Sequence, residues 1–528
     1  MLKKVIIDLR VITMPSHSRF SINLALNAFN ILLNIELSDC ENRDLINDSR
    51  DLKPGDIFAA TVGHLSDGRD YIENAIAAGA ELILVQCEDI SAHGKVEFRK
   101  PALNQSELKN NVTLVHFYEL NKHLSSLANL YYQQPHHKLT TIGITGTNGK
   151  TTISQIIAQL LECSGRSCAV IGTVGAGKLD ALNPIKNTTP GPTELNKLLH
   201  GFVHEGVTDV AMEVSSHALE QHRLSPSMID VAVFTNLSRD HLDYHQTMEN
   251  YAQAKKQLFT QNATQIAILN GDDNCAQGWL KSWPSDAQVI VYGINASVKT
   301  HSFFLHATQI KRNTSGVEFT IESHKGEVTI QSALMGDFNI SNILAAAAVL
   351  LSQHYTLAEI AQSISQLKAV VGRMEVFTSP NLPTSVVDYA HTPDALENAL
   401  KACRAHCNGS LHVVFGCGGD RDKGKRPQMG VVAEIHADHI VLTNDNPRTE
   451  SPEKIVSDIL VGCKYPKKVN VILARKKAVM NTIEASSLND MILFAGKGHE
   501  DHIVIGNEKI AYNERELVQS IYANKAVS

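Results

Sequence analysis

The sequence has few features of a secreted or polyanion-binding protein. Its nine cysteines form no C-x-x-C pair, and their odd number fits free thiols in a reducing compartment better than a disulfide framework or a zinc site. Cys403 and Cys407, one helical turn apart, are expected to be small residues on one helix. The formal net charge of −7 gives no basic footprint for nucleic acid. We therefore expect a cytoplasmic protein that does not bind nucleic acid.

Long apolar runs are also missing. In the opening MLKKVIIDLRVITM, Asp8 and Arg10 interrupt the apolar run before it reaches the length of a signal-peptide core, and no later stretch is long enough to span a bilayer. We expect no membrane insertion. The composition, with 43% hydrophobic and 20% charged residues, is that of a globular protein. Because one hydrophobic core stops growing at about 250 to 300 residues, a chain of 528 residues is expected to form two or three domains.

The stretch from 138 to 152, KLTTIGITGTNGKTT, predicts a phosphate-binding loop. Its apolar run breaks at Gly146 and Gly149, which allow a tight turn whose N–H groups point at a polyphosphate. A helix from about Thr151 then presents its positive end. Lys150 is placed to reach the terminal phosphates, and the Thr151 hydroxyl to bind a magnesium ion on them.

This loop departs from the pattern G-x-x-x-x-G-K-[ST], because Ile144 stands at the first glycine position and Gly146 follows two residues later. An ordinary glycine-rich turn between a strand and a helix is the alternative. The flanking sequence favours the phosphate loop, since a β-branched run precedes it, SQIIAQLLECSG with helical spacing follows, and SCAVIGTVG returns the chain to a sheet.

Apolar runs alternate with helical patterns and divide the chain into three α/β units, expected at residues 1–118, 119–369 and 370–528. In the second unit the runs TDVAMEV, IDVAVFTNL, QIAILNGDD and QVIVYG indicate a mostly parallel sheet covered on both faces. The third repeats the pattern with SVVDYA, LHVVFG, HIVLTN, VNVIL and MILFAG. NKHLSSLANLYYQQP is expected to be a linker helix, and the alanine run of DFNISNILAAAAVLL to serve packing.

Polar residues follow these strands, at the sheet edge where ligands bind. A glutamate, one of the histidines His217, His241 and His245, and a threonine hydroxyl of the phosphate loop are expected on one edge and suit a magnesium ion on a nucleotide. Glu213 is the glutamate that ends the first of these strands. The adjacent Lys255 and Lys256, in MENYAQAKKQLF, are by themselves expected on a solvated helix face. The same default applies to Asp48, Ser49 and Asp67 near two turns of the first unit, which by themselves indicate caps or turn residues.

Five stretches together carry a resemblance to a known family: TGTNGKTT, NTTPGPTEL from 187, EVSSHALEQHR from 213, NLSRDHLDYH followed by Ala254 and Lys255, and LNGDD from 269. The chain beyond about its first forty residues resembles the ATP-dependent Mur ligases of peptidoglycan synthesis. The resemblance implies an N-terminal uridine-binding domain, a central P-loop ATPase-like parallel-sheet domain and a C-terminal Rossmann-like domain. It also implies Mg²⁺ as cofactor and ATP as co-substrate. The other implied substrates are a UDP-N-acetylmuramoyl dipeptide and meso-diaminopimelate, and the enzyme is expected to be a monomer.

By the same resemblance the catalytic residues are Lys150, His241 and Lys255, the last as an N6-carboxylysine formed with carbon dioxide. Thr151 and Glu213 are implied to bind the magnesium ion of ATP, and His241 and carbamylated Lys255 a second ion. The implied ATP-binding residues are Gly146, Thr147, Asn148, Gly149, Lys150, Thr151, Thr152, Asn270, Asp273, Arg373, Asp388 and His391. The implied residues for the UDP substrate are Ser49, His64, Leu65, Ser66, Asn187, Thr188, Thr189, Ser215, Gln221 and Arg223.

The C-terminal third is implied to bind the incoming amino acid through Arg421, Asp445, Asn446, Pro447, Arg448, Gly496 and Glu500. The two common candidates, lysine and meso-diaminopimelate, differ by one carboxylate at the far end. The fork of donors on Arg448 matches a carboxylate bidentately, and DNPR resembles the diaminopimelate-adding members. The alternative is that Arg448 pairs with Glu450 on the surface.

The implied reaction is amide formation through an acyl phosphate. No side chain is an obvious nucleophile, so positioning and electrostatics are expected to supply most of the rate. A folylpolyglutamate synthetase would share this chemistry but would not explain the polar stretches of the first unit or DNPR. A nucleotide-gated binding protein without ligase activity would need the phosphate loop but no amino-acid pocket.

Overall fold

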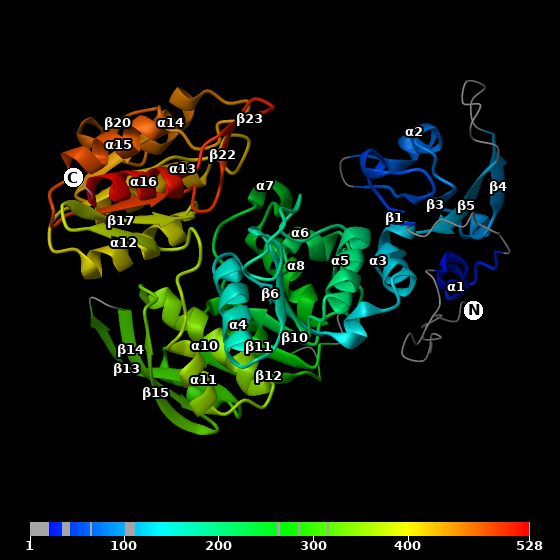
Figure 1. The fold of residues 1–528 in the computed structure, drawn as a ribbon, viewed down its shortest axis with the longest axis horizontal. Coiled ribbons are helices and arrows are strands. Elements are labelled where there is room, and N and C mark those ends of the chain that lie inside the picture. Colours follow the sequence, from blue (N-terminus) through cyan, green and yellow to red (C-terminus); the bar gives the residue numbers. More distant parts are fainter. Residues whose placement is uncertain are drawn as a thin grey trace.

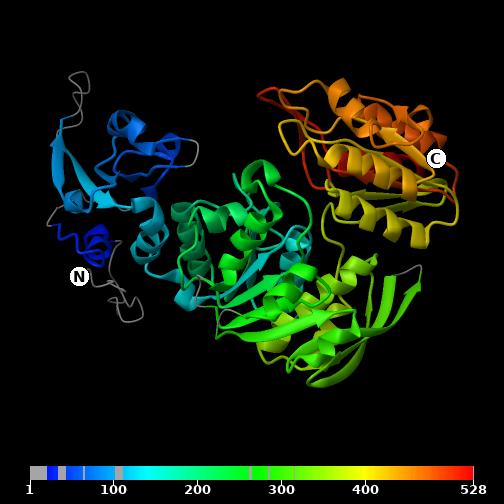
Figure 2. The same cartoon turned by 180° about the vertical axis from the view of Figure 1, so that it is seen from behind.

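The computed structural model of the chain describes residues 21–33, 43–63, 66–100, 111–260, 264–283, 286–313 and 316–526. Three α/β units follow one another (Figure 1), with the N-terminal unit in blue at one end and the C-terminal unit in yellow to red at the other. The view from behind (Figure 2) agrees, and the cyan and green central unit joins the two. The predicted three-unit α/β fold is confirmed.

The N-terminal unit contains a five-stranded sheet in the order β1-β2-β3-β5-β4, parallel except for β4, which runs antiparallel to β5. Its apolar strands are buried because helices cover them. The elements are β1 (Leu45–Ile46), β2 (Ile57–Ala60), β3 (Leu82–Cys87), β4 (Val96–Arg99), β5 (Val112–Tyr118), α1 (Ile22–Asn27), α2 (Ile72–Ala77) and α3 (Leu120–Tyr131).

Helix α3, expected to be a linker, is part of the core of the N-terminal unit. Its Leu120, Leu124 and Leu127 are buried together with side chains of α1 and of the sheet. The chain then turns through Gln133 and Gln134, both with positive φ, before it enters the central unit. Helix α3 also packs against α5 (Pro192–His204) of the central unit, where Asn129 donates to Asn196 Oδ1 at 3.1 Å, so it connects the two units as expected of a linker. The predicted boundary at residue 118 precedes α3. That boundary and the one at 369 stay predictions.

The central unit contains a ten-stranded sheet in the order β15-β14-β13-β12-β11-β10-β6-β9-β7-β8. The strands from β13 to β7 in this order are parallel to their neighbours, and β8, β14 and β15 are antiparallel. The strands are β6 (Thr140–Thr145), β7 (Cys168–Gly172), β8 (Gly175–Gly177), β9 (Asp209–Glu213), β10 (Val231–Phe234), β11 (Ile266–Asn270), β12 (Gln288–Gly293), β13 (Phe304–Asn313), β14 (Gly316–Ser323) and β15 (Gly326–Ser332).

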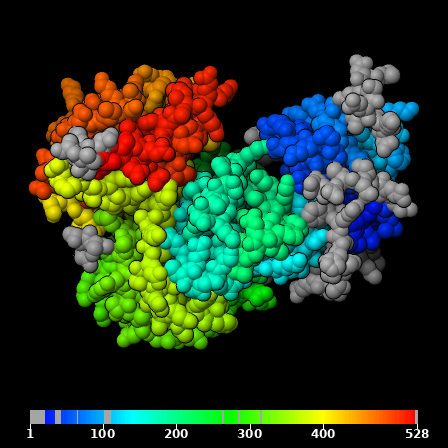
Figure 3. All heavy atoms as spheres, viewed as in Figure 1, coloured from blue at the N-terminus to red at the C-terminus, as the bar shows by residue number. Residues whose placement is uncertain are grey.

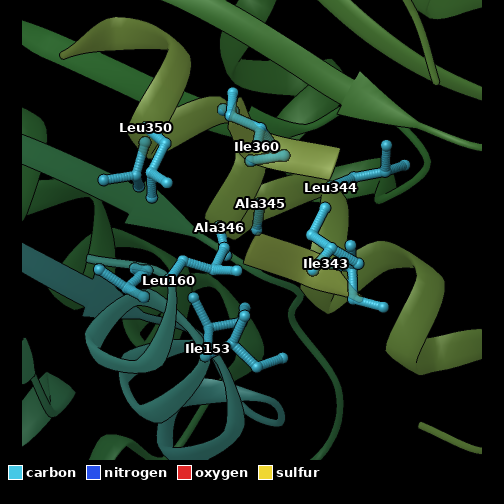
Figure 4. Close-up of a cluster of buried hydrophobic side chains, with 14 of the residues drawn as sticks. Ile153, Leu160, Ile343, Leu344, Ala345, Ala346, Leu350 and Ile360 are labelled. Atoms are coloured by element: carbon cyan, nitrogen blue, oxygen red, sulfur yellow. The ribbon is translucent and has the colours of Figure 1, made fainter. Parts of the chain in front are cut away.

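Helices cover both faces of this sheet, and α4 packs against α10 on one of them. Figure 4 shows Ile153 and Leu160 of α4 against Ile343 and Ala346 of α10. The alanines allow this close approach, so their predicted packing role is confirmed. The helices are α4 (Lys150–Cys163), α5 (Pro192–His204), α6 (Ser216–Glu220), α7 (Leu242–His245), α8 (Met248–Thr260), α9 (Asn274–Leu280), α10 (Asp337–Ser352) and α11 (Leu357–Ile364).

The C-terminal unit contains a six-stranded sheet in the order β16-β17-β21-β18-β19-β20, with only β16 antiparallel, and a separate hairpin β22-β23. Its strands are β16 (Glu375–Ser379), β17 (Leu382–Asp388), β18 (Leu411–Phe415), β19 (His439–Leu442), β20 (Asn470–Val471), β21 (Met491–Ala495), β22 (His502–Ile505) and β23 (Glu508–Ala511). Its helices are α12 (Pro393–His406), α13 (Lys425–His436), α14 (Pro452–Leu460), α15 (Arg475–Ala485) and α16 (Glu514–Ala526).

Two smaller expectations also concern helices. Cys403 is buried in α12 and Cys407 half-buried at its end, as expected for small residues on one helix. A search of the described residues finds no helix that combines the length and the apolar character needed to cross a bilayer.

Candidate active site

The predicted phosphate loop joins the central strand β6 to helix α4, which begins at Lys150. Gly146 has a φ of +150°, and a methyl group on it would lie 1.8 Å from the Thr235 hydroxyl oxygen, so the turn requires glycine. The Lys150 ammonium donates to the carbonyl oxygens of Gly146 and Thr147, both at 2.8 Å. A lysine and a helix N-terminus beside such a turn form the arrangement that binds a polyphosphate.

A cavity of about 480 Å³ lies between the carboxyl edge of the central sheet and the C-terminal unit. In the space-filling view (Figure 3) the C-terminal unit, yellow to red, rests directly on the central unit. Most of the predicted ATP-binding residues line the cavity, from both units: Thr147, Asn148, Gly149, Lys150, Thr151, Thr152, Asn270, Arg373, Asp388 and His391.

Two predicted ATP-binding residues, Gly146 and Asp273, are not among the lining residues. The Asp273 carboxylate caps α9 through the N–H groups of Cys275 and Ala276, and its other oxygen accepts from the Leu237 N–H at 2.9 Å. These backbone donors hold the carboxylate in place. A contact of Asp273 with the adenine stays a prediction.

Thr151 and Glu213 meet at the predicted metal position. The Thr151 hydroxyl donates to Glu213 Oε1 at 2.8 Å, and Glu213 also accepts from the Thr173 N–H at 2.8 Å. Arg373 reaches across from the C-terminal side and donates to Thr151 Oγ1 at 3.1 Å. Hydroxyl and carboxylate oxygens are ligands that Mg²⁺ prefers. Within the described ranges no group of three or more His, Cys, Asp and Glu side chains is placed to hold a metal ion.

Lys255 is buried, with 1% of its surface exposed, whereas Lys256 is half-buried above the Trp279 ring. The Lys255 amine donates at 2.7 Å to the Gly146 carbonyl oxygen, which also accepts from Lys150. Burial, and next the Lys150 ammonium, lower the pKa of Lys255 well below its ordinary value. The prediction that Lys255 lies on a solvated helix face is therefore wrong.

His241 lies at the same edge of the cavity, with Nε2 at 3.5 Å from the Asp240 carboxylate. Burial lowers the pKa of His241 to about 3, so the imidazole is neutral near pH 7, the form that binds metals. Asp240 also approaches His391 at 3.9 Å and Lys425 at 3.8 Å. These longer contacts connect the His241 loop to the C-terminal unit.

Four of the residues predicted for the UDP substrate form one network beside the cavity. Thr189 donates to Ser215 Oγ at 3.3 Å, and Arg223 donates to the Thr189 carbonyl and to Gln221 Oε1, both at 2.7 Å. Thr188 lines the cavity, and Asn187 next to it is exposed. The structure thus brings together residues that the chain carries in two separate stretches.

The uridine end of the prediction falls on the N-terminal unit. Ser49 is half-buried at the start of a 3-10 helix that Asp48 caps, and Asp67 caps a second one, so the capping role expected for these two acids is confirmed. Lys186 of the central unit contacts Asp48 at 3.4 Å and Asp51 at 2.5 Å. Because Lys186 directly precedes Asn187 and Thr188, Ser49 lies beside the loop that carries these two predicted substrate-binding residues. Ser66 is exposed, and the predicted His64 and Leu65 lie outside the described residues.

The residues predicted for the amino acid come from three loops, which follow β18, β19 and β21. Asn446 donates to Glu500 Oε2 at 2.9 Å. Arg448 donates to the Gly419 carbonyl at 2.8 Å, and no acidic side chain in the described part of the chain pairs with its guanidinium. Burial, and next the nearby guanidinium of Arg421, lower the pKa of Arg448. Of the other predicted residues, Arg421 is exposed, and three are buried: Asp445, Pro447 and Gly496.

The surface pair between Arg448 and Glu450 is not formed. Glu450 accepts instead from the buried Arg426 at 2.8 Å and lies 3.4 Å from Lys423. Two guanidinium groups, those of Arg421 and Arg448, lie on the same side of Gly418, close enough for Arg421 to lower the pKa of Arg448. Such a pair suits the binding of an anion.

Three family models match the chain in sequence order. They are "Mur ligase family, catalytic domain" at 45–132, "Mur ligase middle domain" at 144–350 and "Mur ligase, glutamate ligase domain" at 372–498. A relative from Haemophilus influenzae, named UDP-N-acetylmuramoyl-L-alanyl-D-glutamate--2,6-diaminopimelate ligase, is 45% identical over 481 residues, which are 91% of this chain and 96% of the relative. The chain belongs to the Mur ligase family.

Solved structures agree with this assignment. A UDP-N-acetylmuramoyl-L-alanyl-D-glutamate--2,6-diaminopimelate ligase resembles this Mur ligase with a TM-score of 0.63 at 33% identity, over 94% of this chain and 97% of the other. MurF from Acinetobacter baumannii, at 16% identity and a TM-score of 0.62, covers 95% of this chain and 98% of its own and shares the fold. A folylpolyglutamate synthase from Mycobacterium tuberculosis, also at 16% identity, shares the fold with a TM-score of 0.56, over 70% of this chain and 91% of its own.

Two lining residues of this Mur ligase were missed in the sequence. Asn342 of α10 lies against the phosphate loop, since a methyl group on Gly149 would be 2.8 Å from its Oδ1. Asp394 of α12 accepts from the Asn148 side chain at 2.9 Å. The available signal was a pair of asparagines at the start of an otherwise apolar helix, Asn339 and Asn342, both buried.

Proposed function

We propose that this Mur ligase uses ATP to join meso-2,6-diaminopimelate to the D-glutamate of UDP-N-acetylmuramoyl-L-alanyl-D-glutamate, in the cytoplasmic synthesis of peptidoglycan precursors. The observation that carries the proposal is 45% identity over 91% of the chain to a ligase of that name. The pocket supports it, because Arg448 has no acidic partner among the described residues at the position predicted to meet the far carboxylate.

The first step is the attack of the D-glutamyl carboxylate on the γ-phosphorus of ATP, which forms an acyl phosphate and releases ADP. Two anions must approach each other, so positive charge is needed between them. Lys150 on the phosphate loop and Arg373, which touches Thr151, supply it from opposite sides of the cavity. The network of Thr189, Ser215, Gln221 and Arg223 is proposed to hold the carboxylate end of the substrate.

Mg²⁺ is the proposed cofactor. Thr151 and Glu213 would hold the ion that accompanies ATP, and His241 and carbamylated Lys255 a second ion. The donor set fits, since it offers a hydroxyl, a carboxylate and a neutral imidazole around one cavity. Bound magnesium would screen the negative charge of the phosphates and of the attacking carboxylate.

Carbamylation of Lys255 follows from its surroundings. Only a neutral amine attacks carbon dioxide, and burial together with Lys150 favours the neutral amine at this position. The nitrogen adds to the carbon of carbon dioxide and loses a proton, which leaves an anionic carbamate. Because the Lys150 ammonium donates to the same Gly146 carbonyl, an anionic carbamate on Lys255 would lie near a positive charge that stabilises it.

In the second step the amine of diaminopimelate attacks the acyl carbon, phosphate leaves and the amide forms. Arg448 and Arg421 would pair with the far carboxylate, and Glu500 would accept from the far ammonium. Lysine lacks that carboxylate and would place its ammonium against guanidinium groups. The C-terminal unit covers the cavity and so limits the access of water to the acyl phosphate.

The test is phosphate release from ATP with the UDP-dipeptide and a panel of amino acids. Release that requires both the UDP-dipeptide and diaminopimelate is the expected result. Release without an amino acid acceptor would indicate a nucleotide-gated binding protein, and use of a folate substrate would favour the folylpolyglutamate reaction. Because one chain carries all three ligand regions, we also propose that the enzyme acts as a monomer, which sedimentation during turnover can check.

A further inference from the structure

Lys497, in the loop after β21, is a fully buried charged residue with 0% of its surface exposed. Its ammonium donates to Asn446 Oδ1 at 2.8 Å, to Glu500 Oε2 at 2.8 Å and to the His502 carbonyl at 2.9 Å. An ammonium has three N–H donors, and all three are used. Lys497 is thus held in one place by groups from two loops and from the start of β22.

Two of these acceptors belong to the amino-acid pocket, and Lys497 determines how they point. Because Asn446 Oδ1 accepts from Lys497 and from the Val504 N–H, its amide nitrogen faces Glu500. Glu500 Oε2 therefore receives two donors, from Lys497 and Asn446. The other oxygen, Oε1, faces Tyr389, whose hydroxyl is at 3.5 Å and which lines the cavity. Oε2 is thus fixed by two donors, and Oε1 lies beside Tyr389 at the wall of the cavity.

The charged groups around Lys497 point to the same positioning role. Two carboxylates, Glu500 and Asp445, lie within reach of the Lys497 ammonium, at 2.8 Å and 3.7 Å. Arg475 also lies near Asp445, at 3.9 Å, but its guanidinium is already bidentate to the buried Glu514, at 2.5 Å and 2.8 Å. The Lys497 ammonium thus approaches two carboxylates of the pocket and offsets the repulsion between them.

We propose that Lys497 is a positioning residue of the amino-acid pocket. It holds Asn446 and Glu500 in the orientation in which they meet the far end of the substrate, and its charge offsets the repulsion between Glu500 and Asp445. This inference rests on the proposed function and deepens it, because it explains how the pocket keeps two acids close together.

The test separates the two half-reactions of the Lys497→Met variant. Hydroxylamine is a small amine that reacts with an acyl phosphate without needing an amino-acid pocket, so hydroxamate formation from ATP and the UDP-dipeptide reports the first half alone. We expect hydroxamate formation to stay within about twofold of the unmodified protein. The KM for diaminopimelate should rise at least about thirtyfold, the consequence of leaving a buried carboxylate without its partner, while the KM for ATP changes little.

The matched control is Lys477→Met, an exposed lysine on α15 of the same unit. It should leave both measurements unchanged. Lack of hydroxamate in the unmodified protein would overturn the proposed function itself. Unchanged diaminopimelate kinetics in Lys497→Met, or parallel loss of hydroxamate and ligation, would overturn the role of Lys497.

A double variant keeps the proposal testable if Lys497→Met alone does not fold. Glu500→Gln removes the negative charge that Lys497 balances, so Lys497→Met in the Glu500→Gln background should raise the KM for diaminopimelate by no more than about twofold. Fully additive effects of the two changes would show that Lys497 does not act through Glu500 and would overturn the proposal.

Discussion

The phosphate loop and the amino-acid pocket are built in opposite ways. The loop is one continuous stretch, in which Lys150 binds the carbonyls of Gly146 and Thr147 only a few residues before it. The pocket joins residues more than seventy positions apart, as between Arg421 and Glu500, and depends on buried side chains such as Lys497. A site built from contiguous residues can be recognised as a motif in the sequence, whereas a site built from distant residues exists only after the unit has folded.

The phosphate loop and the amino-acid pocket also differ in the chemical step for which they are proposed. In the proposed reaction the loop serves the phosphate transfer that forms the acyl phosphate, on which the second half depends, whereas the pocket serves only the amine that enters in the second half. Damage to the loop should therefore remove all activity, and damage to the pocket should leave acyl phosphate formation intact.

The largest effect is expected for Lys150→Ala. The γ-phosphate would lose its cation, so hydroxamate formation and ligation should both fall by about a thousandfold or more. Initial rates with each nucleophile measure this, and an unchanged far-ultraviolet circular dichroism spectrum shows that the variant is folded. A folded variant that ligates like the unmodified protein would disprove the phosphate-loop assignment.

The next largest effect is expected for Lys255→Ala, which should lower the rates of hydroxamate formation and of ligation by about ten- to a hundredfold, because the variant loses a predicted metal ligand. Added short carboxylates should restore part of the rate by replacing the carbamate oxygens. Lys256→Ala is the matched control, since this neighbour is half-buried on the Trp279 ring. Loss in Lys256→Ala and full activity in Lys255→Ala would show that the wrong lysine was chosen.

Arg448→Ala should affect only the pocket. Its guanidinium is half-buried without substrate, so we expect a cost of about 2 kcal/mol in diaminopimelate use, at the lower end for a buried charge pair that loses one partner. The KM values for ATP and the UDP-dipeptide should barely change. Equal use of lysine and diaminopimelate by the unmodified protein would contradict the assignment, as would unaltered kinetics of the variant.

The smallest effect is expected at the contact between the two regions. Arg239 of the central unit lies 3.2 Å from Asp422 of the C-terminal unit, and the arginine is exposed enough for water and salt to screen the pair. Asp422→Asn should therefore change the free energy of unfolding by no more than about 1 kcal/mol and leave hydroxamate formation intact. A strong loss of acyl phosphate formation would mean that this pair controls closure.

The sequence allowed the parallel strands to be predicted because each is a short, continuous apolar run. Strands β13, β14 and β15, which form two antiparallel ladders, were missed, since they mix buried residues with exposed charges such as Lys311 and Glu318, which pair across the ladder at 2.9 Å. The hairpin β22-β23 was missed for the same reason, because β23 is fully exposed. Strands that face water on one side lack the signal that marks a buried strand.

The site was predictable where function depends on contiguous residues and less so where it depends on folding. Lys255 and Lys256 are neighbours in the sequence and differ only in what surrounds them, since one lies under the phosphate loop and the other beside an indole ring. Asn342 and Lys497 were not identified as part of the site, because the contacts that connect them to it, with the phosphate loop and with Asn446, join residues far apart in the chain. Long-range contacts of this kind cannot be read from spacing.

The crowding at Gly146 has a consequence for inhibitor design. A methyl group there would lie 1.8 Å from the Thr235 hydroxyl oxygen and 3.1 Å from the Asn236 backbone nitrogen, so no larger residue fits without a shift of the neighbouring strand. Resistance usually arises when a target exchanges a residue that the drug touches. A compound that contacts Thr147 and Asn148, which line the cavity, would therefore bind a turn whose path requires glycine at position 146.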